Sequence, residues 1–241
     1  MKYLKSGLLL LTTFLSLLVY AQTADEIISK HIDALGGKDK LSGIKSIQIE
    51  SVMSVMGNEA PMTTTILNGK GYKNEVDFNG NKIIQVVTDK GGWSVNPMMG
   101  SSEPQAMPEE QLKGSKSEIF IGGPLVDYAA KGNTVELKGK EKVGSADAYK
   151  VVVTSADKAI STYYIDPTTY YIVKAVRNVN VNGQEGEIST VFSDYRKTDY
   201  GFAMPYAMET TLPQGFTMSS SVKRVDINKD VDEKVFEMPK G

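Results

Sequence analysis

Side chains that commonly perform chemistry are scarce in this chain. Its 241 residues include one histidine, His31, and no cysteine. The absence of thiols excludes a cysteine nucleophile, a disulfide framework, an iron–sulfur cluster and Cys-ligated zinc. With one imidazole, a multi-histidine metal site cannot form within one chain. No G-x-S-x-G motif offers a nucleophile for His31 to activate, so we interpret His31 as a packed or hydrogen-bonded residue and expect no enzyme activity.

One acidic stretch resembles a calcium-binding loop. Oxygen-bearing side chains fall at positions 1, 3, 5, 7 and 12 of residues 226–237, namely Asp226, Asn228, Asp230, Asp232 and Glu237. Position six is Val231, where the sharp turn of a calcium loop needs glycine. The preceding residues 216–225 have a strand pattern, and no helix pair flanks the loop. We therefore expect a solvated acidic turn, and we predict neither a metal nor a cofactor.

The balance of basic and acidic residues argues against a nucleic-acid-binding protein. The chain has 27 basic and 29 acidic residues, whereas nucleic-acid binders usually show a clear basic excess on the binding domain. We expect no nucleic-acid partner.

The distribution of methionine says more about binding than the charged residues do. Six methionines lie close together in the sequence around Trp93, namely Met53, Met56, Met62, Met98, Met99 and Met107. Methionine side chains are flexible and polarizable, so they adapt to varied apolar ligands and also fill irregular cores. The cluster is therefore either core filler or the lining of a ligand cavity.

The N-terminus has the layout of a secretory signal peptide. Lys2 and Lys5 precede an apolar stretch from Leu8 to Val19, and Val19-Tyr20-Ala21 forms a small-x-small cleavage site. The apolar run is shorter than the roughly 20 residues that span a membrane. We expect cleavage after Ala21, a periplasmic location, and a mature protein that does not span the membrane.

The mature chain begins with one helix and continues as strands. Thr23 and Glu26 match a capping box, and apolar residues then recur at helical spacing until Gly36-Gly37. From Ile44 the period changes to two, which indicates half-buried β-strands. Strand patterns and turn residues predict about a dozen antiparallel strands, near residues 44–55, 60–67, 72–79, 81–88, 92–97, 133–142, 147–154, 159–165, 170–181, 184–197, 204–212 and 216–227.

The pattern breaks between residues 98 and 132. Pro108 followed by two glutamates predicts a helix through about Leu112. Residues 115–121 and 124–130 also look like short helices, so we expect a helical insert that covers the sheet. We predict one domain over residues 22–241, a strongly curved antiparallel sheet wrapped over a few helices. A closed lipocalin-like barrel is the alternative.

Several motifs resemble those of periplasmic outer-membrane lipoprotein carriers, the LolA-like family. Residues 163–174 (YYIDPTTYYIVK) and 190–195 (TVFSDY) are similar to the family's "ID-x-x-T … F-x-D-Y" stretch. Residues 231–241 resemble its terminal "D-x-x-x-F-x-x-P-x-G". Residues 71–75 and 88–97 are similar to its "F-R-x-E" strand and "D-G-x-x-W-x-Y-x-P" hairpin. The resemblance covers nearly the whole mature chain and points to a divergent sub-branch.

The resemblance implies a mainly β fold (α+β), an unclosed half-barrel of about 11 strands with short helices that lid its concave face. It also implies an apolar cavity for acyl chains and a function without catalysis. In such carriers an arginine on an early strand holds the lid, and that position is Lys73 here. Lysine is a point charge rather than a planar fork, so Lys73 is the candidate latch in altered form.

We arrive at two functional hypotheses. The first is a periplasmic carrier that binds the acyl chains of lipoproteins or lipids for transfer toward the outer membrane, with inner- and outer-membrane transfer proteins as partners. The second is a non-catalytic envelope sensor or interaction module on the same scaffold. For the carrier, the residues expected to line the cavity are Met53, Val55, Trp93, Met98, Met99, Met107, Leu112, Ile119, Phe120 and Leu125.

Overall fold

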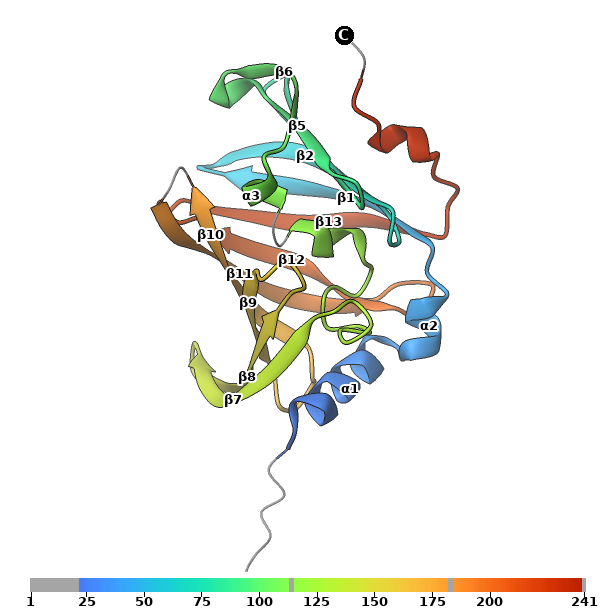
Figure 1. The fold of residues 1–241 in the computed structure, drawn as a ribbon, viewed down its shortest axis with the longest axis vertical. Coiled ribbons are helices and arrows are strands. Elements are labelled where there is room, and N and C mark those ends of the chain that lie inside the picture. The colour runs from blue at the N-terminus through green and yellow to red at the C-terminus, as the bar shows by residue number, and fades with distance from the viewer. Residues whose placement is uncertain (1–21, 113–114, 182–183, 240–241) are drawn as a thin grey trace, which may run out of the picture.

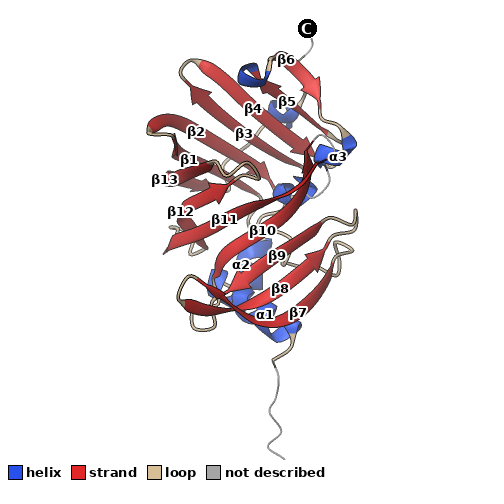
Figure 2. Ribbon diagram, turned by 90° about the vertical axis from the view of Figure 1, so that its left-hand side faces the viewer, coloured by secondary structure: helices blue, strands red, loops and turns tan. Residues whose placement is uncertain are grey.

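A computed structural model describes residues 22–112, 115–181 and 184–239; the predicted signal peptide, residues 1–21, lies outside this range. The described chain forms one antiparallel sheet of thirteen strands, strongly curved (Figures 1 and 2). The strands are β1 (Ser46–Val55), β2 (Asn58–Leu67), β3 (Gly71–Phe78), β4 (Asn81–Thr88), β5 (Gly92–Asn96), β6 (Ser101–Ala106), β7 (Thr134–Val143), β8 (Ala146–Thr154), β9 (Ile160–Ile165), β10 (Ile172–Val181), β11 (Gln184–Lys197), β12 (Ala203–Thr211) and β13 (Thr217–Ile227).

The strand order makes the sheet from two meanders. Strands β1–β6 follow one another on one side, β7–β13 on the other, and β1 pairs with β13 in the middle. The register of this seam pairs Ile47 with Ile227 and Val55 with Met218. Strands β6 and β7 end the sheet on either side, so the unclosed half-barrel is confirmed and the closed barrel is wrong.

The helices are few and short. They are α1 (Ala24–Leu35), α2 (Lys38–Ser42), α3 (Glu109–Leu112) and the 3₁₀ helices η1 (Pro97–Met99), η2 (Ser115–Ile119) and η3 (Glu233–Phe236). Helix α1 starts with the predicted capping box: the Thr23 hydroxyl accepts from the backbone N–H of Glu26, whose carboxylate accepts from the backbone N–H of Thr23. It ends at Gly36, whose φ of 125° suits glycine.

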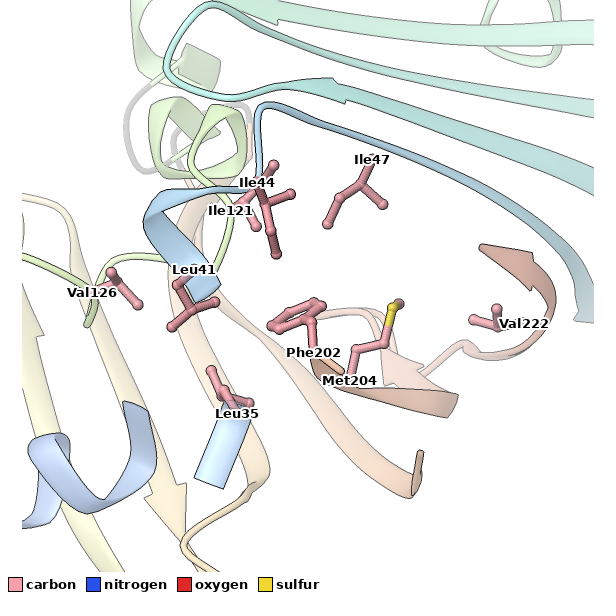
Figure 3. Packing of buried hydrophobic residues seen from close by; sticks show 9 residues of the cluster. All are labelled: Leu35, Leu41, Ile44, Ile47, Ile121, Val126, Phe202, Met204 and Val222. Atoms are coloured by element: carbon pink, nitrogen blue, oxygen red, sulfur yellow. The ribbon is translucent and has the colours of Figure 1, made fainter. Parts of the chain in front are cut away.

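Helices α1 and α2 cover the inner, concave face of the sheet (Figure 1). One buried cluster packs α2 and the chain after η2 against β1, β12 and β13 (Figure 3). It comprises Leu35, Leu41, Ile44, Ile47, Ile121, Val126, Phe202, Met204 and Val222. A second cluster packs the apolar stripe of α1 against the β7–β9 region: Ile27, Ile28, Leu125, Tyr149, Val151, Val153 and Ile165. Together these clusters fix α1 and α2 to the sheet.

On the outer, convex face, the chain that follows β13 packs over part of the first meander. Trp93 and Val95 of β5 pack with Val86 of β4 against Phe236 of η3. The indole nitrogen of Trp93 donates to the backbone carbonyl of Phe236 at 2.9 Å. We call residues 228–239 the C-terminal strap, because they lie across this face.

The predicted helical insert is only partly helical. The region 98–132 contains η1, the edge strand β6, α3 and η2, and its remainder, residues 120–132, forms turns. Helix α3 lies where the sequence predicted it, η2 is a 3₁₀ helix, and the predicted helix 124–130 is wrong. Asp127, inside that range, has a φ of 49°, a left-handed backbone that a right-handed helix cannot contain. We call residues 107–133, of which 113–114 are not described, the crossing segment.

In the part of the chain that the structure describes, no helix is both long and apolar enough to cross a membrane.

Candidate functional site

A pocket lies between the crossing segment and the inner face of the second meander. Its volume is about 240 Å³. Phe120, Gly123 and Pro124 line it from the crossing segment, together with Ser117 and Glu118 of η2. The sheet lines it with residues of β9, β10 and β11: Ser161, Tyr163, Ala175, Val176, Arg177, Ile188, Thr190 and Phe192. We call this the inner pocket.

Strand alternation explains why these side chains meet. Ala175 pairs with Tyr163 on one side and with Thr190 on the other, and Arg177 pairs with Ser161 and Ile188. Residues paired across antiparallel strands point to the same face. The inner pocket therefore has a floor of two such rows, apolar except for hydroxyls and one guanidinium.

The turn between β2 and β3 holds the crossing segment in place. The backbone N–H of Gly69 donates to the carbonyl of Ile119 at 2.8 Å. The Asn68 side chain accepts from the N–H of Ile121 at 3.1 Å and donates to the carbonyl of Ile44 at 3.0 Å. Asn68 thereby ties the end of α2 and the crossing segment to the first meander.

Lys131 contacts two other residues of the crossing segment. Its ammonium donates to the carbonyl of Gly123 at 3.0 Å and lies 4.5 Å from the centre of the Phe120 ring. Burial lowers the pKa of Lys131 to about 8. The contact fixes Phe120, which lines the inner pocket, over the sheet.

An ion pair spans the inner pocket. Nη1 of Arg177 on β10 donates to Oε1 of Glu118 on η2 at 3.1 Å, with side chains 31% and 25% exposed. Burial raises the pKa of the Glu118 carboxyl above its usual value, and Arg177 opposes that rise. The pair is thus one polar tie between the crossing segment and the second meander in a partly desolvated site.

Tyrosines of both meanders face this pair. Burial raises the pKa of Tyr163 to about 12 and also raises that of Tyr72, and the charges of Glu118 and Arg177 act on both hydroxyls. Asn74 donates to the Tyr72 hydroxyl at 3.1 Å, and its own Oδ1 is buried without a partner among the described residues. A polar patch therefore lies beside the pocket, within a mainly apolar concavity.

Of the ten residues predicted to line a cavity, Phe120 lines the inner pocket. Ile119 and Leu125 are 2% and 1% exposed, and Leu125 belongs to the cluster beneath α1. Their burial makes them part of the packing that supports the pocket.

Four more of these residues lie on the inner face, away from the inner pocket. Met53 and Val55 pair with Ser220 and Met218 of β13 and share the face of Ile47, to which the helices pack. Met107 and Leu112 rest on Gly92 of β5, where an added Cβ would be 2.9 Å from the Met107 sulfur and 2.8 Å from a Leu112 methyl. These residues extend the apolar concavity over the first meander.

The other three predicted lining residues lie elsewhere. Met98 and Met99 are 61% and 82% exposed on η1. Trp93 is buried on the opposite face under the C-terminal strap. The reason is alternation: Trp93 pairs with Val86, and Val87, one position further, is on the inner face.

Lys73 also lies on the outer face, since it pairs with Val86 and Thr65. Its ammonium contacts Glu75 at 3.1 Å, and it lines an outer pocket of about 210 Å³ with Asp230 and Asp232 of the C-terminal strap. The crossing segment is on the other side of the sheet. Cations that do contact the crossing segment are Arg177 of β10, through Glu118, and Lys38 of α2, through Asp127. Lys73 is not placed to act as its latch.

Arg177, Glu118 and Tyr163 were not singled out from the sequence. A usable signal was present for Arg177: it follows Ala175 and precedes Val179 in the same alternating series of β10. A charged residue at an inward position of a strand needs a partner. The partner, Glu118, comes from a distant segment and is found only in the folded structure.

His31 and the acidic loop take structural roles. His31 is 1% exposed, and its Nδ1 lies 2.8 Å from the carbonyl of Tyr170; burial lowers its pKa. In the loop, Asp226 pairs with Arg224 and Lys229, and Asp232 caps η3 by accepting from the N–H of Lys234. Among the described residues no cluster of three or more metal-binding side chains occurs.

No protein-family model and no curated protein matches the sequence. The fold does match solved structures. A LolA superfamily protein from Nitrosomonas europaea is 14% identical with a TM-score of 0.60, over 90% of this chain and 98% of that one. A DUF1329 family protein from Desulfovibrio piger is 14% identical with a TM-score of 0.57, again over 90% and 98%.

A third solved structure is a domain assigned to outer-membrane lipoprotein sorting, from Vibrio parahaemolyticus. It is 14% identical with a TM-score of 0.56, and the match covers 87% of this chain and 95% of that domain. The three matches extend over most of each chain. The chain therefore has a divergent LolA-like fold.

Proposed function

We propose that this chain is an exported, non-enzymatic carrier that shelters the acyl chain of a lipid or lipoprotein against the concave face of its sheet. In this proposal the signal peptide is removed after Ala21, residues 22–241 form one periplasmic domain, and transfer proteins of the inner and outer membranes load and unload it. The inner pocket beneath the crossing segment is the observation that carries the proposal.

The size of the pocket indicates how it would work. At about 240 Å³ it lies just below the range of about 300–1,000 Å³ typical of small-molecule sites. A long acyl chain needs more room, so the crossing segment must move outward and act as a lid. Apolar side chains already extend the concavity toward the first meander, where Met53, Val55, Met107 and Leu112 lie.

The contacts of the crossing segment suit such a movement. Between residues 115 and 123, the segment is tied to the first meander by the hydrogen bonds of Gly69 and Asn68, and to the second meander by the Glu118–Arg177 pair. Further along, Asp127 pairs with Lys38 of α2 at 2.7 Å and the Tyr128 hydroxyl donates to Asp25 of α1, so that part of the segment stays attached to the helices. Each tie is worth on the order of 1 kcal/mol. An acyl chain gains about 0.8 kcal/mol for each buried methylene, so about four buried methylenes offset the loss of these three ties to the sheet.

A pocket-filling variant tests the carrier. Ala175→Phe places a ring in the inner pocket, whereas the control Val191→Phe adds the same ring at a position 41% exposed, paired with Lys174 on the other face. We expect mature wild-type protein to take up a fluorescent fatty-acyl probe, Val191→Phe to match it, and Ala175→Phe to lose at least about tenfold in affinity, or 1.4 kcal/mol. Equal binding by all three would contradict the proposal.

A second candidate, an interaction module, is favoured by apolar side chains at one end of the sheet. The connections β1–β2, β5–β6, β8–β9 and β12–β13 lie at this end. Exposed side chains here are Met56, Met98, Met99 and Phe216 in these connections and Ile160 at the start of β9. These side chains are spread along this end of the sheet, where they are exposed for contact with a partner. Isolation of mature protein with a stable protein partner and without lipid would favour this module over the carrier.

A further inference from the structure

The Glu118–Arg177 pair places a guanidinium inside an apolar pocket, which a simple contact between a lid and the sheet does not require. The chain has three arginines, and the other two, Arg196 and Arg224, are 59% and 56% exposed and pair with Asp194 and Asp226. Arg177 instead projects from β10 into the inner pocket. A guanidinium in an apolar pocket is costly unless an anion accompanies it.

The anion in this structure is part of the crossing segment. Glu118 comes from η2 and meets Nη1 of Arg177 at 3.1 Å. Its own environment disfavours the charge, because burial raises the pKa of Glu118 more than Arg177 lowers it. Movement of the crossing segment would return Glu118 to water and leave Arg177 without its anion.

The groups around Arg177 suit a carboxylate. A guanidinium offers five N–H donors in a planar fork that matches two carboxylate oxygens. The hydroxyls of Ser161, Tyr163 and Thr190 line the same pocket, and high pKa values keep the Tyr163 hydroxyl protonated as a donor. Apolar side chains of Ala175, Ile188 and Phe192 lie beside them, where the first methylenes of a chain would pack.

We propose that Arg177 binds the free carboxylate at the head of a single acyl chain, and that Glu118 occupies the same position when the pocket is empty. This inference rests on the proposed carrier function and narrows its ligand to a fatty-acid-like anion. Glu118 is then an internal substitute for the ligand, and a carboxylate that displaces it also releases the crossing segment.

The test compares two ligands of equal chain length, palmitate and uncharged monopalmitoylglycerol. Binding is measured by calorimetry at pH 8 on delipidated mature protein. We expect wild type to prefer palmitate by at least about tenfold, the effect of one charge-assisted hydrogen bond of about 1.5 kcal/mol. Arg177→Gln should reduce the preference to less than about twofold, and Glu118→Gln should strengthen palmitate binding because it removes the competing anion. Arg196→Gln is the matched control and should change nothing.

The outcomes separate this inference from the proposed function. If both ligands bind wild type equally, or if the preference survives Arg177→Gln, the carboxylate site is wrong and the carrier stands. If neither ligand binds, both fail. Glu118→Gln replaces one carboxylate oxygen by an amide nitrogen and keeps the size of the side chain, so it keeps the test decisive should Arg177→Gln not fold. Weaker palmitate binding by Glu118→Gln would overturn the inference.

Discussion

The indole nitrogen of Trp93 donates a hydrogen bond to the backbone carbonyl of Phe236 over 2.9 Å. The two residues belong to β5 and η3 and lie 143 positions apart in the sequence. This contact joins the C-terminal strap to the outer face of the sheet, where Phe236 also covers Gly71 so closely that an added Cβ would be 2.7 Å from its ring.

The fluorescence emission of Trp93 should respond to changes in the packing of the C-terminal strap and not to ligand binding in the inner pocket. It is the chain's only tryptophan and is 6% exposed. Phe236→Ala removes a buried ring, so we expect a red-shifted emission and a loss of about 3 kcal/mol in the free energy of unfolding. Met238→Ala, at a side chain 48% exposed, is the control. Ligand binding should leave the emission of wild type unchanged, and a large shift on binding would place the ligand on the wrong face.

His31 should make stability depend on pH. Burial lowers its pKa below 6.5, so its contribution to stability is fully present above the unfolded value of 6.5 and is lost as the pH falls through the folded value. We expect wild type to lose stability between pH 7 and pH 5, and His31→Asn to lose less over the same interval. Thermal unfolding at several pH values checks this, and parallel curves for the two proteins would refute it. Since the chain has one histidine, its imidazole resonances can be followed without assignment.

The two ends of the Glu118–Arg177 pair should be energetically coupled. Glu118→Gln and Arg177→Gln should each speed deuterium uptake by the backbone of residues 115–121, and the double variant should not add their effects. For a pair about a quarter to a third exposed, the coupling should be about 0.5–1 kcal/mol. Hydrogen exchange with mass spectrometry measures it; additive effects would mean that the pair does not hold the crossing segment.

Asn68 should set how firmly the crossing segment is held at the first meander. Asn68→Ala removes the bonds to Ile121 and Ile44, and we expect a loss of about 1–3 kcal/mol in stability. Release of a bound acyl probe should also become faster. The matched control is Asn58→Ala at an exposed position of β2. Unchanged release in the Asn68 variant would show that this anchor does not limit opening.

Variants at Leu125 and Phe120 should distinguish a residue that packs beneath the pocket from one that lines it, although both were predicted to line the cavity. Leu125 is 1% exposed beneath α1, so Leu125→Ala should cost about 2–5 kcal/mol in the free energy of unfolding. Phe120 lines the inner pocket, so Phe120→Ala should weaken probe binding at a smaller cost in stability. Denaturant unfolding and probe titration of both variants test this. The reverse pattern would move the binding site toward α1.

Strand alternation predicted most of the sheet. Twelve of the thirteen strands coincide with predicted runs, and the exception is β6. Its sequence, SSEPQA, contains proline and no alternating apolar residues. An edge strand with one face exposed tolerates such a sequence, so periodicity cannot reveal it.

The sequence did not predict which face of the first meander is concave. Val86 and Val87 are neighbours in β4, point to opposite faces and are both 0% exposed. The C-terminal strap covers one face and the chain around η2 lies near the other. Because both faces are apolar, the pattern assigns Trp93 and Lys73 to neither, and that choice depends on where a distant segment packs. Trp93 was predicted to line the cavity because methionines surround it in the sequence, and Lys73 was predicted to hold the lid from the motif resemblance.

The pairing of β1 with β13 has a consequence for how the concavity is assembled. Each meander consists of hairpins between neighbours in sequence, so each can form early from local contacts. The seam joins residues as distant as Ile47 and Ile227, and its closure carries the entropic cost of a long loop. Until that step, β1 and β13 expose unpaired edges that can recruit other chains. We therefore expect slow seam closure to limit folding, and the concave face to be completed in that single late step.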